Sequence, residues 1–174
     1  MIASDTRRYL NRSPEARSGG EDLKHLLSAF ATPQLFALTI HRLAHFLECR
    51  GWQRLAALAT RLNQMLHHVS ISPRSCIGPA CLLPHPAGVS FAGSAGRDLT
   101  LYALCVCSAA LPCGDPKLEE APRLGDGVAV GGHATLIGPV SVGDGCKIGY
   151  GVRVDRDVPA GMLVVSASMR VRFE

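Results

Sequence analysis

A period of six residues, kept without a break from Leu124 to Pro159, is the feature of this sequence that most limits its fold. Read in sixes, the stretch is LGDGVA, VGGHAT, LIGPVS, VGDGCK, IGYGVR and VDRDVP. The first place of each line is aliphatic and the fifth is small or β-branched, whereas the places between are mostly Gly, Asp or other polar residues. This period fits neither an α-helix nor a plain amphipathic strand. It is the signature of a β-helix, in which short parallel strands wind round a triangular prism and stack coil on coil.

The two apolar places of each line are predicted to point into this prism. Glycines would then occupy its corners, where the chain turns sharply and a positive φ favours a residue without Cβ. An earlier set of coils follows the same period, and it opens at Ile71, Ile77, Leu83, Val89, Ala95, Leu101 and Cys107. The period stops after residue 107 and resumes only at Leu124, and the segment 108–123 contains three prolines, so we expect it to project as a loop. The predicted fold is a left-handed parallel β-helix of hexapeptide repeats over residues 71–165, followed by a short C-terminal tail over residues 166–174.

The first 70 residues have a different pattern. Residues 1–20 mix charged residues, Ser, Pro and Gly without periodicity, which predicts a poorly ordered tail. Over residues 21–70, apolar residues recur at helical spacing, with a break at Pro33 and a stop at Gly51. The stripes comprise Leu35, Leu38, Leu43, Phe46 and Leu47 in one segment and Leu55, Leu58, Leu62 and Leu66 in the next. We therefore expect an N-terminal α-helical cap on the β-helix.

Composition excludes several classes of protein. With 174 residues, 47% of them hydrophobic, the chain is expected to form one globular domain. The net charge of +4 is modest and no run of Lys and Arg is interleaved with aromatics, so we expect no nucleic-acid partner. No apolar stretch reaches the roughly 20 residues that span a bilayer, and the N-terminus lacks a basic segment followed by an apolar one. A cytoplasmic protein without membrane contact is expected.

The seven cysteines lack paired CxxC spacing. Four of them fall on inward places of the coils: Cys81, Cys105, Cys107 and Cys146. They are predicted to be small buried hydrophobic residues, not disulfides or metal ligands.

Several short segments of the cap and of the coils carry a resemblance to a known family. They are His41-Arg42-Leu43-Ala44-His45-Phe46-Leu47, Ile71-Ser72-Pro73, Ile77-Gly78, His85, Lys147-Ile148-Gly149-Tyr150-Gly151 and Asp157-Val158-Pro159-Ala160. In these segments the chain resembles a divergent member of the bacterial serine O-acetyltransferases, and the similarity covers nearly everything from residue 21 onward. Hexapeptide coils are shared by many acyltransferases and by γ-class carbonic anhydrases, so the helical cap makes the resemblance more specific.

This resemblance implies an acyltransferase of cysteine biosynthesis that transfers an acetyl group from acetyl-CoA to the hydroxyl of L-serine. It places the general base at His85, whose imidazole would accept the hydroxyl proton as the oxygen attacks the thioester. Because His85 lies outside the inward places of its hexad, we expect it on an outer face. In the family the loop that corresponds to residues 108–123 folds over the acceptor site.

On the donor side, the resemblance implies that CoA lies along the coils at VGGHA and IGYGV. Lys147 would serve a CoA phosphate, and Gly149 and Gly151 would allow close backbone approach. The family has small residues where this chain has His133 and Tyr150. These two bulkier side chains either narrow the channel or stack on the adenine or pantetheine of CoA.

The acceptor side departs from the family pattern at four positions. The family has an Asp one coil before the His, a second Asp directly before it, and an Arg-His pair in the projecting loop. This chain has Ser70, Pro84, Glu120 and Ala121 at those places. Loss of the orienting carboxylate from a Ser-His-Asp arrangement costs about 10⁴ in turnover. The expected activity on L-serine is therefore weak, and the acceptor is L-serine or another small hydroxylated molecule.

Two other functions are considered. A catalytically silent member would keep the scaffold and bind a ligand or partner. A metal enzyme of carbonic anhydrase type would need three convergent histidines, and the coils hold only His85 and His133, so no metal is expected.

The resemblance also bears on partners. It implies a homotrimer, with the sites between neighbouring prisms. Family members hold cysteine synthase with a C-terminal tail that ends in Ile, whereas this sequence ends in Arg170-Val171-Arg172-Phe173-Glu174, so no such complex is expected.

Overall fold

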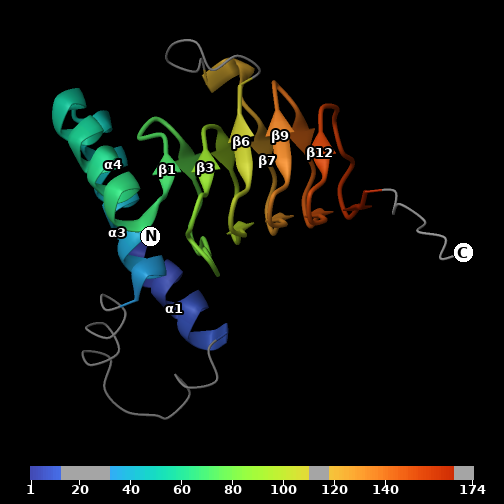
Figure 1. The fold of residues 1–174 in the computed structure, drawn as a ribbon, viewed down its shortest axis with the longest axis horizontal. Coiled ribbons are helices and arrows are strands. Elements are labelled where there is room, and N and C mark those ends of the chain that lie inside the picture. The colour runs from blue at the N-terminus through green and yellow to red at the C-terminus, as the bar shows by residue number, and fades with distance from the viewer. Residues whose placement is uncertain (13–31, 110–117, 167–174) are drawn as a thin grey trace, which may run out of the picture.

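The fold is given by a computed structural model that describes residues 1–12, 32–109 and 118–166 (Figure 1). Helices α1 (Ile2–Arg12), α3 (Pro33–Cys49) and α4 (Gln53–His67) lie at one end of a stack of short strands. Residues 167–174 of the expected C-terminal tail and residues 110–117 of the loop expected at 108–123 lie outside the described residues.

The strands form three parallel sheets, one for each face of a prism. The first sheet, labelled in Figure 1, contains β1 (Ser70–Ile71), β3 (Ser90–Phe91), β6 (Val106–Ser108), β9 (Thr135–Ile137) and β12 (Arg153–Val154). The second contains β2 (Cys76–Ile77), β4 (Ser94–Ala95), β7 (Arg123–Leu124) and β10 (Ser141–Val142). The third contains β5 (Thr100–Leu101), β8 (Ala129–Val130), β11 (Lys147–Ile148) and β13 (Leu163–Val164). Because the chain visits the sheets in turn and each strand pairs with its counterpart in the next coil, the predicted parallel β-helix of hexapeptide coils is confirmed.

The interior of the prism consists of the side chains that the six-residue period marks as inward. All twelve are buried: Leu124, Val128, Val130, Ala134, Leu136, Val140, Val142, Cys146, Ile148, Val152, Val154 and Val158. The four cysteines on inward places are buried as well, and all four are free thiols. Burial raises the pKa of Cys81 and of Cys105 to about 12 and that of Cys107 well above its ordinary value, so these thiols stay protonated.

The early coils contain a shift of register that the six-residue period did not predict. Phe91, not Val89, is the lateral partner of Ile71 and of Cys107. The chain takes eight residues from Leu83 to Phe91, where the next coil takes six from Leu101 to Cys107. It then takes only four from Phe91 to Ala95. The turn that carries His85 is thus two residues longer than its counterpart in the next coil.

The segment expected to form a projecting loop connects the first sheet to the second. It follows β6 and returns through η2 (Leu118–Glu120) to β7. Residues 110–117 lie outside the described part of the chain.

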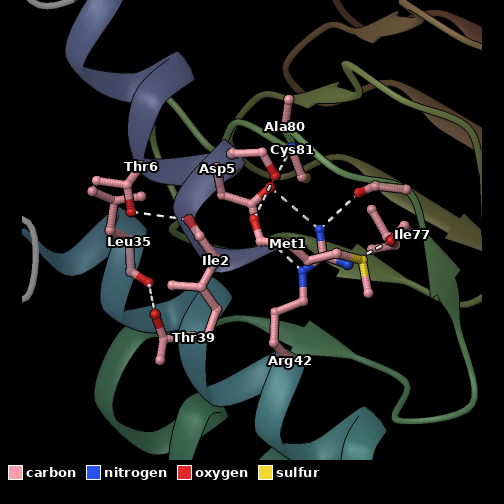
Figure 2. A network of polar contacts seen from close by, with 12 residues as sticks. Met1, Ile2, Asp5, Thr6, Leu35, Thr39, Arg42, Ile77, Ala80 and Cys81 are labelled. Carbon is pink, nitrogen blue, oxygen red and sulfur yellow. Dashed lines mark hydrogen bonds and ion pairs between the residues drawn. The ribbon is translucent and has the colours of Figure 1, made fainter.

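Helix α1 occupies residues where the sequence suggested a poorly ordered tail. The carboxylate of Asp5 is buried and forms an ion pair with Arg42 of α3, with 3.1 Å between Oδ2 and Nε (Figure 2). Asp5 also accepts the N–H of Cys81 at 2.8 Å, and Arg42 donates to the carbonyl of Gly78 at 2.7 Å. Local composition predicts that Asp5 is a solvated charge, because its partner Arg42 lies 37 positions away in the sequence.

The leucine stripes of the cap are buried only in part on α3 and not at all on α4. On α3, Leu35 and Leu38 are buried, but Leu43 and Phe46 are about half exposed. The α4 stripe of Leu55, Leu58, Leu62 and Leu66 is exposed, and the buried residues of that helix are Ala56 and Asn63. The amide of Asn63 donates to the carbonyl of Ala37 at 3.0 Å, so small and polar residues join the two helices. No helix among the described residues is both long and apolar enough to cross a membrane.

The buried face of α3 includes His41, which is almost fully enclosed. Neither of its ring nitrogens has a hydrogen-bond partner among the described residues. Burial, with smaller contributions from Arg42 and His45, lowers the pKa of His41 from 6.5 to about 3. The unfolded chain therefore binds a proton between those two pH values that the folded chain excludes, and stability falls as the pH is lowered through this window.

We expect the variant His41→Leu to lose less stability than the wild type when the pH is lowered from 7 to 5. The difference should be about 2 kcal/mol, since one proton over about 1.5 pH units is worth about 1.36 kcal/mol per unit. Urea unfolding of both proteins at the two pH values measures it, with the exposed His68→Leu as control. Equal losses for wild type and His41→Leu would contradict the expectation.

Candidate active site

The turn of residues 84–89 presents the predicted base, His85, on the outside of the prism. Its side chain is exposed, as expected for a residue outside the inward places. Prolines precede and follow it, and a residue before proline is restricted to extended backbone conformations. His85 therefore stands at a stiff turn, since Pro86 fixes its own φ as well.

Backbone hydrogen bonds hold this turn in the stack. The N–H of Gly88 donates to the carbonyl of His68 at 2.9 Å, and the N–H of Leu104 donates to the carbonyl of Ala87 at 3.0 Å. The amide of Gln34, in the first turn of α3, lies 3.5 Å from the carbonyl of Pro84. The turn that carries His85 is thus supported by the helical cap on one side and the next coil on the other.

The turns that follow stack on it and form one edge of the prism, between the third and first sheets. We call this edge, made by residues 84–89, 102–105, 131–134 and 149–152, the His85 edge. Its turns are linked by further backbone hydrogen bonds, from the N–H of His133 to the carbonyl of Ala103 at 3.1 Å and from Gly151 to Gly132 at 2.9 Å. The structure therefore places His133 and Tyr150 on the same edge as His85.

His133 and Tyr150 contact each other across neighbouring coils. Their ring centroids are 5.0 Å apart, and the backbone of His133 has a φ of 57°. The Tyr150 ring also covers Gly132, because a Cβ added to that glycine would lie 2.8 Å from Cε2 of the tyrosine. Tyr150 is 70% exposed, so its ring lies on the surface and is not enclosed by the chain.

The remaining donor-side residues differ in what they offer to a ligand. Lys147 points outward from β11 and is exposed. Gly151 has a φ of +66° and open space where a side chain would be. Gly149 has no such open space, because a Cβ there would lie 2.9 Å from the carbonyl oxygen of Val164 in the next coil. Gly149 thus serves the stacking of the coils, and the open backbone is at Gly151.

The four positions that the resemblance assigns to the acceptor side are Ser70, Pro84, Glu120 and Ala121. Ser70 is half-buried in β1, beside Ser90 of β3, and Pro84 adjoins His85. Glu120 is exposed in η2, while Ala121 is buried. Among the described residues no carboxylate forms a hydrogen bond or ion pair with His85, and no group of three or more His, Cys, Asp or Glu side chains is arranged to hold a metal.

This geometry can support proton transfer at an exposed surface. A neutral imidazole can accept a proton from an alcohol near pH 7. The stiff turn fixes the backbone of His85 relative to the edge, although no carboxylate of the described residues orients the ring. The sequence pointed to His85, His133 and Tyr150 separately. Their place on one edge follows from the three-sided coil, because each turn stacks on the turn one full coil earlier, and Thr135 and Arg153, 18 residues apart, are lateral partners.

Comparison with known proteins gives three kinds of similarity. The family model of the bacterial transferase hexapeptide (six repeats) matches residues 121–156. The serine acetyltransferase of Mycobacterium tuberculosis is 31% identical over 172 residues, which are 98% of this chain and 71% of that protein.

Solved structures agree with this similarity. The crystal structure of Neisseria gonorrhoeae serine acetyltransferase in complex with serine superposes with a TM-score of 0.79 at 25% identity, and covers 95% of this chain. The Brucella abortus serine acetyltransferase in complex with coenzyme A superposes with a TM-score of 0.81 at 21% identity over 97% of this chain, which shows a shared fold. The chain spans 65% of the length of each of these two structures.

Proposed function

The chain belongs to the serine acetyltransferase family, and from this membership we propose that it transfers the acetyl group of acetyl-CoA to the hydroxyl of L-serine or another small hydroxylated acceptor. The observation that carries the proposal is the exposed imidazole of His85 on the same prism edge as the open backbone of Gly151. Similarity to proteins solved with serine and with coenzyme A supports this choice of substrates.

In the proposed reaction, His85 acts as the general base. Its imidazole accepts the proton of the acceptor hydroxyl while the oxygen attacks the thioester carbon of acetyl-CoA. The bond between that carbon and the CoA sulfur then breaks, and His85 returns the proton to the departing sulfur. The products are the O-acetyl ester and free CoA.

The proposed donor site follows the His85 edge toward the C-terminal coils. Lys147 provides a positive charge for a CoA phosphate, and Gly151 provides backbone that a ligand can approach closely. Gly149 lets the coils stack closely, because a Cβ there would lie 2.9 Å from the carbonyl oxygen of Val164, and its contact with CoA stays a prediction. His133 and Tyr150 border the pantetheine arm, and Tyr150 must turn away from Gly132 for the arm to reach the backbone there.

The direct test is release of CoA on incubation with acetyl-CoA and a panel of small alcohols that includes L-serine, together with calorimetric binding of acetyl-CoA. Release with at least one alcohol, and binding of acetyl-CoA, are expected. If no alcohol leads to release of CoA and acetyl-CoA does not bind, the proposed enzyme activity is wrong and the catalytically silent scaffold is favoured.

Removal of the Tyr150 ring should tighten binding of the donor. Because the ring occupies the space above Gly132, we expect Tyr150→Ala to lower the Kd of acetyl-CoA by up to about tenfold, or about 1.4 kcal/mol. Calorimetry measures this change, and Arg156→Ala, at an exposed position on another edge, is the control. Weaker binding by Tyr150→Ala would show instead that the ring stacks on the donor.

The proposal includes left-handed winding of the coils and assembly as a homotrimer. The exposed stripe of four leucines on α4 supports self-association, because contiguous apolar surface of this kind marks interaction sites. A molar mass of one chain by light scattering would contradict the trimer.

A further inference from the structure

A cysteine and a histidine meet at the C-terminal end of α3, on a different part of the molecule from the His85 edge. His45 and Cys49 are four residues apart, which places them on one face of the helix. The Sγ of Cys49 lies 3.7 Å from Nε2 of His45. This pair contacts the first coil at the turn of residues 72–75, between the first and second sheets.

The first coil fixes which nitrogen of His45 faces the thiol as an acceptor. The Nδ1 of His45 lies 2.8 Å from the carbonyl oxygen of Pro73. A carbonyl oxygen can only accept a hydrogen bond, so Nδ1 must carry the proton in this contact. In the neutral ring, Nε2 is then the unprotonated nitrogen, and the thiol of Cys49 donates to it. A thiol, an imidazole and a group that orients the imidazole are the arrangement that activates a nucleophile.

The surroundings leave the sulfur accessible. Cys49 is exposed and His45 is half-buried. Beside them, Arg74 and Glu48 form an ion pair at 3.1 Å, which ties the end of α3 to the same turn. The Arg50 guanidinium lies over the Phe46 ring at 4.7 Å. Cys49 and His45 thus lie where the end of α3 is fixed to the turn of residues 72–75.

The other described cysteines lack this arrangement. Cys76 is also exposed, but its nearest polar partner is the carbonyl oxygen of Arg74, at 4.0 Å from Sγ, and not an imidazole. The four remaining ones are buried in the prism. Cys76 is therefore a natural internal comparison for Cys49.

We propose that Cys49 is a reactive thiol, activated by His45, that is modified by small disulfides such as those of amino-acid thiols. In this exchange the proton of Cys49 passes to Nε2 of His45 as the sulfur attacks one sulfur of the disulfide R–S–S–R. The S–S bond breaks, a mixed disulfide Cys49–S–S–R forms, and the departing thiolate takes the proton to give R–SH. No electrons are needed from outside, because the small disulfide is the oxidant.

The experiment measures how fast each cysteine of the whole protein reacts with dithiobis(nitrobenzoate), with peptide mass mapping to assign each adduct. Cys49 should react at least about tenfold faster than Cys76, in keeping with the contribution of a positioned base. His45→Gln should slow Cys49 to the rate of Cys76 and leave the rate of Cys76 unchanged. Cystine should then form a mixed disulfide at Cys49 before any at Cys76.

Unfolding supplies the control for intrinsic reactivity. In denaturant, Cys49 and Cys76 should react at similar rates, since the imidazole is no longer held beside the sulfur. If His45→Gln does not fold, the comparison of folded with denatured wild type still decides. Equal rates for Cys49 and Cys76 in the folded protein, or an unchanged Cys49 rate in a folded His45→Gln, would overturn the proposal.

Discussion

His85→Ala should lower the rate of CoA release by about 10² to 10⁴, which corresponds to roughly 3 to 5 kcal/mol of activation free energy. The reason is that a neutral alcohol is a poor nucleophile, and the imidazole of His85 is the proton acceptor on the exposed edge that we propose as the site. The fold should be unaffected, because the side chain is exposed and the hydrogen bonds that hold this turn use the turn's own backbone atoms. Single-turnover release of CoA, with the most active acceptor, is the measurement.

Two companion variants separate base catalysis from a general effect on the edge. His68→Ala removes another exposed histidine close to this turn, since the carbonyl of His68 accepts the N–H of Gly88. If His85 alone acts as the base, this variant should release CoA at a rate within about twofold of wild type. Ser70→Asp should raise the rate on L-serine, since a carboxylate one coil earlier would orient the imidazole. A His85→Ala variant that releases CoA as fast as the wild type would exclude His85 as the base.

The hexad period predicted the interior of the prism because each inward place has the same environment in every coil. A residue at the first or fifth place meets its counterparts above and below, so apolar character alone reveals its position. The prediction was wrong at Val89, because the turn that contains His85 is two residues longer and Phe91 takes the place on the sheet. Local composition did not show this, because Val89 is itself apolar and buried.

The polar contacts between coils could not be predicted from the sequence either. The Gly-Asp-Gly segments at 125–127 and 143–145 suggested tight corners only. In the structure, Asp126 accepts the N–H of Arg97 at 2.8 Å, and Asp144 accepts the N–H of Asp126 at 2.7 Å. Each aspartate thus closes the turn of the preceding coil, a role that requires knowledge of which residues stack.

The contacts between the cap and the first coil could not be predicted from the sequence either. The resemblance at His41-Arg42 drew attention to this segment without giving a reason for it. In the structure, Arg42 is the residue that joins three elements, because it pairs with Asp5 of α1 and donates to the carbonyls of Ile77 and Gly78 in the first coil (Figure 2). Such a contact between distant segments has no periodic pattern in the sequence, so the composition of residues 1–12 does not predict α1.

Asp5→Ala should destabilise the protein by about 3 to 5 kcal/mol, because it leaves the buried guanidinium of Arg42 without its counter-charge. It also leaves the N–H of Cys81 without its acceptor. Part of this loss is expected as undocking of α1 from the prism. The other contact that holds α1 is made by Arg8, which donates to the carbonyl of Leu99 at 2.9 Å. The total loss of stability is then limited by the free energy with which α1 docks.

Urea unfolding measures the global loss, and amide hydrogen exchange over residues 2–12 detects the undocking. The matched control is Asp155→Ala, which removes an exposed ion pair with Arg156 and should change stability by no more than about 0.5 kcal/mol. Asp5→Leu combined with Arg42→Met should recover part of the loss, since no unpaired charge remains, but not all of it, because the carbonyls of Ile77 and Gly78 lose a donor. If Asp5→Ala costs no more than Asp155→Ala and leaves exchange in α1 unchanged, the ion pair does not hold the helix to the prism.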